Sequence, residues 1–126
     1  MLKKAFRNFV QAALLWVGLW STIAGRSQSA SQLAFFEKRI RPLLAKNCYE
    51  CHSSKEKKFK GGLALDTKAA TLRGGDSGPA LVSKKPALSL LIEAVEQSGE
   101  LKMPPKKRLS KTDVALLKKW IAMGAP

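Results

Sequence analysis

The segment Cys48-Tyr49-Glu50-Cys51-His52 constrains this chain more than any other part of the sequence. It contains both cysteines and the only histidine among the 126 residues. A disulfide between two cysteines so close together would close a small, strained ring and would not staple a fold. A structural zinc site needs about four nitrogen or sulfur ligands, and these residues supply too few unless two chains share the metal. A thioredoxin-like redox site expects a βαβ context, which this sequence lacks.

The CxxCH spacing is that of covalent c-type haem attachment. Two thiols one helical turn apart can each add to a haem vinyl group, and the adjacent imidazole is then carried to the iron. We therefore predict one haem c per chain, with Cys48 and Cys51 as the thioether residues and His52 as the proximal ligand through Nε2. A chance match of five residues is the competing interpretation, and the export signal described below argues against it.

The second axial ligand cannot be another histidine of the same chain, so the methionines are the candidates. Met1 would be lost with the N-terminal signal, and Met123 lies near the end of the last predicted helix, where a core role is expected. Met103 directly precedes Pro104 and Pro105, which stiffen the backbone and can aim its side chain. We predict Met103 as the distal ligand, with an open or weakly held sixth site as the alternative.

Residues 1–30 have the pattern of an export signal. Lys3, Lys4 and Arg7 precede an uncharged apolar stretch at 9–25, and small residues follow it. The alternative is an uncleaved membrane anchor, although the stretch is short for a complete span. We expect a cleaved signal and a location in the periplasm or an equivalent compartment, with membrane association through the N-terminus as the second interpretation.

The charge of the chain predicts acidic partners. All four charged residues of the segment 1–30 are basic, so residues 31–126 retain 19 Lys and Arg against 9 Asp and Glu. Such a surplus favours docking to acidic protein surfaces. The lysines are scattered, aromatic residues are few and no nucleic-acid module is recognisable, so we expect no nucleic-acid binding.

The remaining pattern predicts an all-α domain at 31–126, with three to five helices and long loops. Apolar residues recur at helical spacing over 31–47, where Pro42 should kink or restart the helix. A second helix is expected over 86–98, from Pro86 to a C-terminal cap at Gly99, and one or two turns over 67–73. The last helix begins at a capping box formed by Ser110 and Asp113 and ends at Gly124. Loops of this length need a central group on which to pack.

Residues 35–125 resemble the planctomycete-type cytochrome c domain. The resemblance rests on FFEKRIRPLLAKNCYECH, GGLALDT, LRGGDSGPALV, LIEAV, LKMPPKKRLS and the ending WIAMGAP. It implies a small class I-like cytochrome c fold, in which the N- and C-terminal helices pack across each other. It also implies that Cys48 and Cys51 hold the haem, that His52 and Met103 bind the iron, and that the Pro79 carbonyl accepts the His52 Nδ1–H bond.

Several other residues are candidates for the surroundings of the haem. We expect an apolar wall from Leu63, Leu65, Leu81, Leu91, Leu101 and Trp120, although Trp120 would also suit the packing between helices. Arg73, Lys102 and Lys106 could neutralise the propionates.

The predicted function is electron transfer by an exported carrier rather than catalysis, because haem with His/Met ligation performs outer-sphere electron transfer. A peroxidase-like enzyme or a small-molecule sensor with an open sixth site is the alternative, but no distal histidine is available for proton transfer. A structural module, in which the haem only completes a small core, is the third class.

Overall fold

The computed structural model describes residues 29–55 and 59–126, so nearly all of the predicted export signal lies outside the described residues. The chain divides into two compact units, Met1–Leu33 and Ala34–Pro126. In the first unit the described residues, 29–33, are helical. All the residues predicted to form the site belong to the second unit. No helix within 29–55 or 59–126 is long and apolar enough to cross a membrane.

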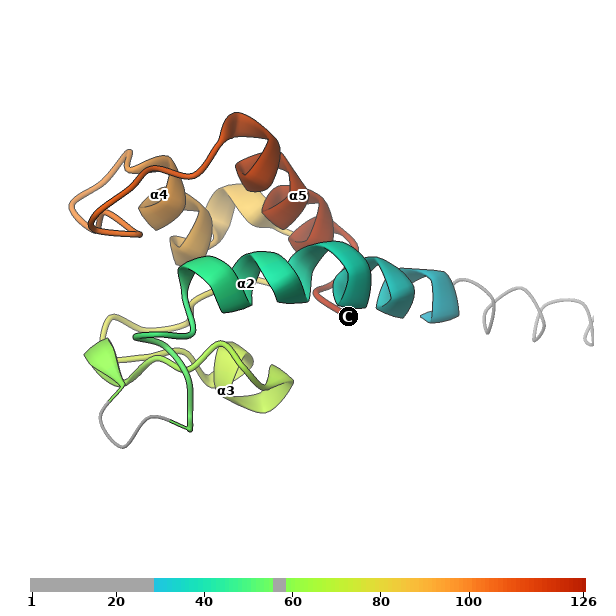
Figure 1. Ribbon diagram of the computed structural model, residues 1–126, viewed down its shortest axis with the longest axis horizontal. Helices are drawn as coiled ribbons and strands as arrows, with labels where there is room; N and C mark the ends of the chain where they lie inside the picture. The colour runs from blue at the N-terminus through green and yellow to red at the C-terminus, as the bar shows by residue number, and fades with distance from the viewer. Residues whose placement is uncertain (1–28, 56–58) are drawn as a thin grey trace, which may run out of the picture. The chain divides into compact units, whose positions relative to one another are not determined.

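The second unit is built from helices and loops, which confirms the predicted all-α fold. Its elements are η1 (Phe36–Ile40), α2 (Arg41–Asn47), η2 (Lys60–Gly62), α3 (Lys68–Arg73), η3 (Pro86–Leu88), α4 (Leu90–Glu96) and α5 (Lys111–Ala122) (Figure 1). No strand occurs in the described part of this unit, where a single isolated bridge pairs Gly75 with Gly78.

Pro42 reshapes the first helix, as its position predicts. The turn η1 is π-helical, and the Arg41 amide at its end donates to the Phe36 carbonyl rather than to a carbonyl four residues back. The α-helical pattern resumes in α2, with Pro42 in its first turn. Because proline has no amide hydrogen, a helix tolerates it best at such a start, and the π turn shifts the hydrogen-bond register accordingly.

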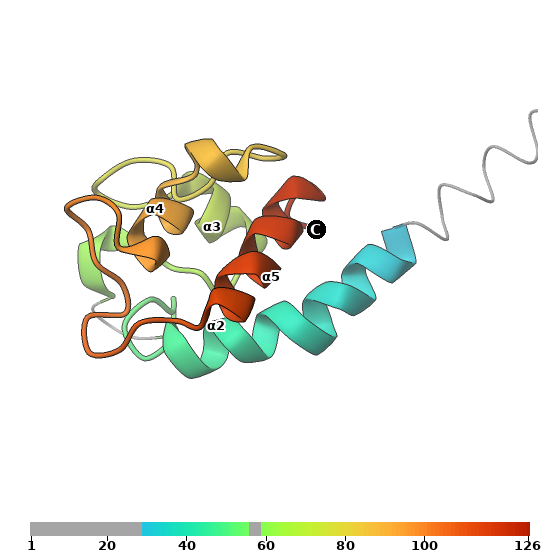
Figure 2. The same cartoon turned by 90° about the horizontal axis from the view of Figure 1, so that it is seen from above.

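The core forms where α5 packs on η1 and on α4. Its most deeply buried side chains are Ile40, Leu44, Leu117 and Ile121. Figure 2 shows α5 lying across the helical segment formed by η1 and α2. The rings of Phe36 and Trp120 meet there with centroids 5.8 Å apart. This is the packing of N- and C-terminal helices that the resemblance implies.

Ser110 caps the last helix as predicted, but the Asp113 carboxylate accepts from the Ser110 hydroxyl at 2.8 Å, so only half of a capping box forms. The Ser110 side chain accepts a hydrogen bond from the Asp113 amide at 3.0 Å, and α5 begins at the next residue, Lys111. Near the other end, the Trp120 Nε1–H donates to the carbonyl oxygen of Pro126 at 2.9 Å. The C-terminal residues are thereby folded back against α5.

The helix expected over 86–98 is interrupted, and this part of the prediction was wrong. Ser89 adopts an extended conformation between η3 and α4. Its buried hydroxyl donates to the Lys85 carbonyl at 2.9 Å and accepts from the Val82 amide at 2.9 Å, so it replaces backbone partners that a continuous helix would supply. The helix also ends early, with Gln97 rather than Gly99 in the left-handed conformation.

Candidate functional site

The end of α2 leads directly into a tight turn that carries Cys48, Cys51 and His52. The side-chain amide of Asn47 donates to the Leu43 carbonyl at 2.8 Å, which satisfies one of the free carbonyls at the end of the helix. Beyond this point the amides of Cys51 and His52 both donate to the Cys48 carbonyl, at 3.1 and 2.8 Å. The two thiols and the imidazole are therefore held within one backbone turn.

Both cysteines are free thiols and are half-buried. Burial raises the pKa of the Cys48 thiol to about 11. This thiol is therefore protonated at neutral pH.

The imidazole of His52 is oriented by a backbone carbonyl. Its Nδ1 lies 3.2 Å from the carbonyl oxygen of Leu63. Because a carbonyl oxygen can only accept, this contact requires the hydrogen on Nδ1 and leaves the Nε2 lone pair free for a ligand. His52 is half-buried, so the other side of the ring remains accessible.

The partner of Nδ1 is thus Leu63 and not Pro79, and the role expected for Pro79 needs correction. Residues 60–65 reach His52 because the Lys60 amide donates to the Cys51 carbonyl and the Leu65 amide donates to the His52 carbonyl, both at 2.9 Å. Pro79 is exposed, at the end of the turn that contains the Gly75–Gly78 bridge. Its backbone packs against Gly74, where an added Cβ would lie 2.7 Å from the Pro79 Cα.

A carboxylate lies next to this pairing and did not figure among the residues expected from the sequence. Oδ2 of Asp66 accepts hydrogen bonds from the Ser53 hydroxyl at 2.7 Å and from the Ser54 amide and hydroxyl, both at 2.9 Å. Burial acts to raise the pKa of Asp66, but the hydrogen bonds from Ser53 and Ser54 outweigh it and lower the pKa to about 2. Asp66 is therefore ionised at all ordinary pH values.

Met103 lies on the long loop between α4 and α5 and is half-buried. Its amide donates to the Ala94 carbonyl of α4 at 2.9 Å, which anchors the middle of the loop. Figures 1 and 2 both place this loop on the same side of the unit as the turn that follows α2. The structure thus brings the two segments to one side, although they are about fifty residues apart in sequence.

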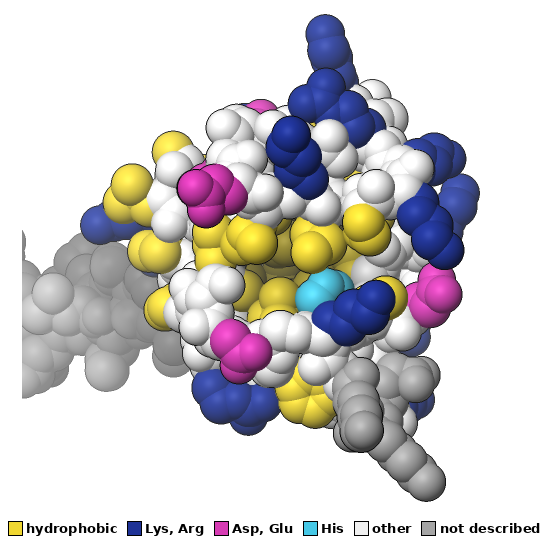
Figure 3. All heavy atoms as spheres, turned by 90° about the vertical axis from the view of Figure 1, so that its left-hand side faces the viewer, with side chains coloured by type: hydrophobic (Ala, Val, Ile, Leu, Met, Phe, Trp, Pro, Cys, Tyr) yellow, Lys and Arg dark blue, Asp and Glu magenta, His cyan; other side chains and the backbone are white. Residues whose placement is uncertain are grey.

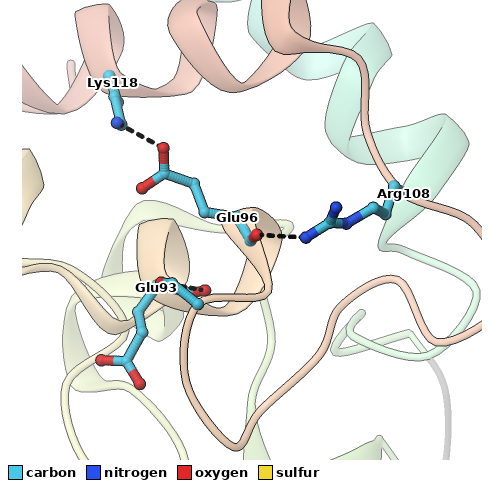
Figure 4. A network of polar contacts seen from close by, with 5 residues as sticks. Glu93, Glu96, Arg108 and Lys118 are labelled. Atoms are coloured by element: carbon cyan, nitrogen blue, oxygen red, sulfur yellow. Dashed lines mark hydrogen bonds and ion pairs between the residues drawn. The ribbon is translucent and has the colours of Figure 1, made fainter.

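The two ends of the loop that carries Met103 are tied together by Arg108, which the sequence prediction also missed (Figure 4). Its guanidinium donates to the Glu96 carbonyl at 3.1 Å and to the Gln97 side-chain oxygen at 3.0 Å. The Lys118 ammonium lies 2.6 Å from a Glu96 carboxylate oxygen and so links α5 to the end of α4. This ion pair is partly exposed and contributes little to stability, but the Arg108 contacts limit how far the loop can open.

The turn and the segments that follow it match a known family. The model of the family described as Planctomycete cytochrome C matches residues 48–107, from the first cysteine of the turn to the loop that carries Met103. Residues 48–107 are therefore similar to this family, over slightly less than half of the chain. No curated protein and no solved structure matches the chain. The match is shorter than the 35–125 of the resemblance, so η1, α2 and α5 lie outside it.

A cytochrome c carries a covalently bound haem, and the residues of this domain suit such a group. The face that Figure 3 shows is the side with the turn and the Met103 loop; hydrophobic side chains surround a hollow there, with the only histidine at its edge. Two free thiols, an imidazole with Nε2 available and a half-buried thioether form the donor set. Within 29–55 and 59–126 no three His, Cys, Asp or Glu side chains cluster to hold a metal ion directly.

The residues predicted for the haem surroundings divide into three groups. Leu65, Leu81 and Leu91 are buried in the core cluster of the second unit, and Leu63 packs against it. Leu101 is 38% exposed, and Trp120 is buried where it packs on Phe36 between helices. Arg73, Lys102 and Lys106 are exposed.

The pKa of Asp66 predicts how acid affects the stability of the domain. Its folded value of about 2 lies below its ordinary value of 3.8, so its contribution to stability is present above pH 3.8 and is lost as the pH falls from there through about 2. In Asp66→Asn this part of the acid destabilisation should be absent. Denaturant unfolding of both proteins across this range measures the difference, with Asp76→Asn as the exposed control. Parallel acid profiles for wild type and Asp66→Asn would contradict it.

Proposed function

We propose that this chain is an exported mono-haem cytochrome c that transfers electrons, with His52 and Met103 as the axial ligands. The observation that carries the proposal is the orientation of His52. The Leu63 carbonyl holds Nδ1, so Nε2 is the free nitrogen, and the same turn carries both thiols. When bound, the haem would supply an iron that accepts and releases one electron.

Met103 is proposed as the distal ligand because of where it is anchored. Its amide is bound to α4, and Arg108 closes the loop on which it lies. Both contacts restrict the backbone of this loop, which lies on the same side of the unit as the turn that follows α2. A preorganised ligand loses less conformational entropy on binding, which favours Met103 over the alternative of an open sixth site.

The first experiment is mass spectrometry of the protein purified from a host that attaches haem to exported proteins. We expect the mass of the chain plus one haem, with an N-terminus near residue 31 if the signal is cleaved. Replacing both Cys48 and Cys51 by Ala removes both attachment points and should abolish the covalent adduct. A colourless wild-type protein at the bare polypeptide mass would refute the proposal.

The second experiment tests the distal ligand. Met103→Ala should keep the covalent haem but lower the reduction potential by on the order of 100 mV, because thioether ligation favours Fe(II). Potentiometry measures the shift, and the long-wavelength absorption band of Fe(III)–thioether ligation should disappear with it. Met123→Ala is the matched control, since Met123 lies half-buried at the end of α5 and should leave both readouts unchanged. An unchanged potential in Met103→Ala would instead support the open site.

We also propose that the redox partners dock through acidic surfaces. A groove of about 450 Å³ lies beside the cytochrome turn, and one of its lining residues, Asn47, directly precedes Cys48. We call it the basic groove. Its charged lining consists of Lys38, Arg39, Lys46, Lys107, Arg108 and Asp113, and its apolar lining consists of Leu43, Leu109 and Leu116. Five cations against one carboxylate attract an acidic partner, while the leucines offer apolar contact once it has arrived.

The charge of the basic groove should control the rate of electron exchange with an anionic reagent. Replacing Lys46 and Lys107 by Glu should slow the reduction of the ferric holoprotein by hexacyanoferrate(II) severalfold at low salt, because electrostatic steering of the anion is lost. The difference should shrink at about 0.5 M salt, where exposed charges are screened. Lys68→Glu combined with Lys84→Glu changes the charge equally, at exposed positions outside the groove. Equal slowing by the two pairs would argue against a specific docking surface.

A further inference from the structure

Residues 63–66 hold the segment that follows the haem-binding turn at several points. The Leu63 carbonyl binds the ring of His52, and the Leu65 amide binds its backbone carbonyl. The position of the imidazole therefore depends on how the segment 63–65 is aligned with residues 52–54. A slip of one residue would move the Leu63 carbonyl away from Nδ1.

Asp66 fixes the alignment of these two segments through Ser53 and Ser54. One oxygen, Oδ2, receives three donors from Ser53 and Ser54, the two residues that directly follow His52. The Ser53 side chain is 5% exposed, so its hydroxyl has little access to water as an alternative partner. Hydrogen bonds to an ionised acceptor are stronger than neutral ones.

We propose that Asp66 is a positioning residue for His52, because its carboxylate locks the residues after the ligand against the segment that binds the imidazole. The inference rests on the proposed function, since the orientation of the ring matters to function only if Nε2 binds iron. The hydrogen bonds of Asp66 go to Ser53 and Ser54, so it acts on His52 through these two residues.

The other carboxylate oxygen of Asp66 makes no comparable contacts. Oδ1 of Asp66 is buried without a hydrogen-bond partner among the described residues. An unsatisfied buried acceptor is destabilising, so the contacts of Oδ2 must offset it. The negative charge of Asp66 also acts at the start of the turn. The pKa of Tyr49 is raised there, mainly by burial and secondly by the charge of Asp66.

An amide at this position cannot reproduce the arrangement. In Asp66→Asn the side chain keeps one oxygen for the Ser53 and Ser54 donors but loses the charge that strengthens those bonds. It also places an NH₂ group where Oδ1 is buried without a partner, or presents that group to the serine donors if it flips. Asn and Asp have nearly the same shape, so the variant changes only the hydrogen bonds between residue 66 and the two serines.

The test uses the haem-loaded protein and two readouts that report position rather than global stability. The first is hydrogen exchange at the Ser54 and Leu65 amides, which donate to Asp66 and to the His52 carbonyl. The second is the set of hyperfine-shifted His52 ring signals in the ferric protein, which depend on the orientation of the imidazole. In Asp66→Asn we expect about ten- to hundredfold faster exchange at both amides, with split or broadened ring signals.

The matched control is Asp76→Asn, which removes the same charge at an exposed carboxylate in a nearby turn. It should leave both readouts as in the wild type. If Asp66→Asn yields no folded holoprotein, Ser53→Ala and Ser54→Ala provide weaker versions of the same change, each removing one hydroxyl donor. They should give smaller increases in exchange at Leu65.

The outcomes separate this inference from the proposed function. A wild-type protein without haem, or with iron that His52 does not ligate, would refute the proposed function. A normal wild-type holoprotein in which Asp66→Asn behaves like Asp76→Asn would overturn the positioning role of Asp66 alone. That role would also be overturned if both serine variants matched the wild type in exchange at Leu65.

Discussion

The hydrogen bond between the His52 ring and the Leu63 carbonyl is the contact on which the rest of the site depends. It selects the tautomer in which Nε2 is free, and it does so without any side-chain partner. The surrounding contacts act to keep that carbonyl in place. The Leu65 amide binds the His52 carbonyl and the Asp66 carboxylate binds the Ser54 amide, so the backbone is held on both sides of Ser53.

The helices provide the frame in which this contact can be maintained. Ile40, Leu117 and Ile121 are completely buried where η1 meets α5, and this packing fixes the direction in which α2 leads into the turn. On the other side, α4 anchors the Met103 amide, and Lys118 links α4 to α5. The loops that carry His52 and Met103 are thus attached to one helical core, which explains how a domain with long irregular segments can keep them in defined positions.

Local sequence signals predicted the elements whose causes are local. The N-terminal cap at Ser110 and the effect of Pro42 are both confirmed, because each depends on residues within about one or two turns. The helix over 86–98 was predicted as continuous because its apolar spacing is helical. Ser89 overrides that pattern through its hydrogen bonds to Val82 and Lys85, which periodicity does not register.

The site divides in the same way. Cys48, Cys51 and His52 were predicted from the sequence, because covalent haem attachment is recognised by two thiols and an imidazole at a fixed spacing along the chain. The hydrogen-bond partner of the His52 ring could not be predicted in this way. Every residue has a backbone carbonyl, and no residue type marks the carbonyl that will accept from Nδ1. Asp66 and Arg108 were equally hidden, since a carboxylate in a loop or a cation among many basic residues has no distinguishing pattern until folding brings its partners to it.

The chemistry of this chain was thus determined by its sequence, as a set of donor atoms and the family pattern that contains them. Two features were decided by the tertiary structure alone. The Leu63 carbonyl, and not that of Pro79, binds the His52 ring, and Arg108 ties the two ends of the Met103 loop together. The physical reason is that hydrogen bonds between distant segments depend on distances of a few ångströms, and only the packing of the helices sets those distances.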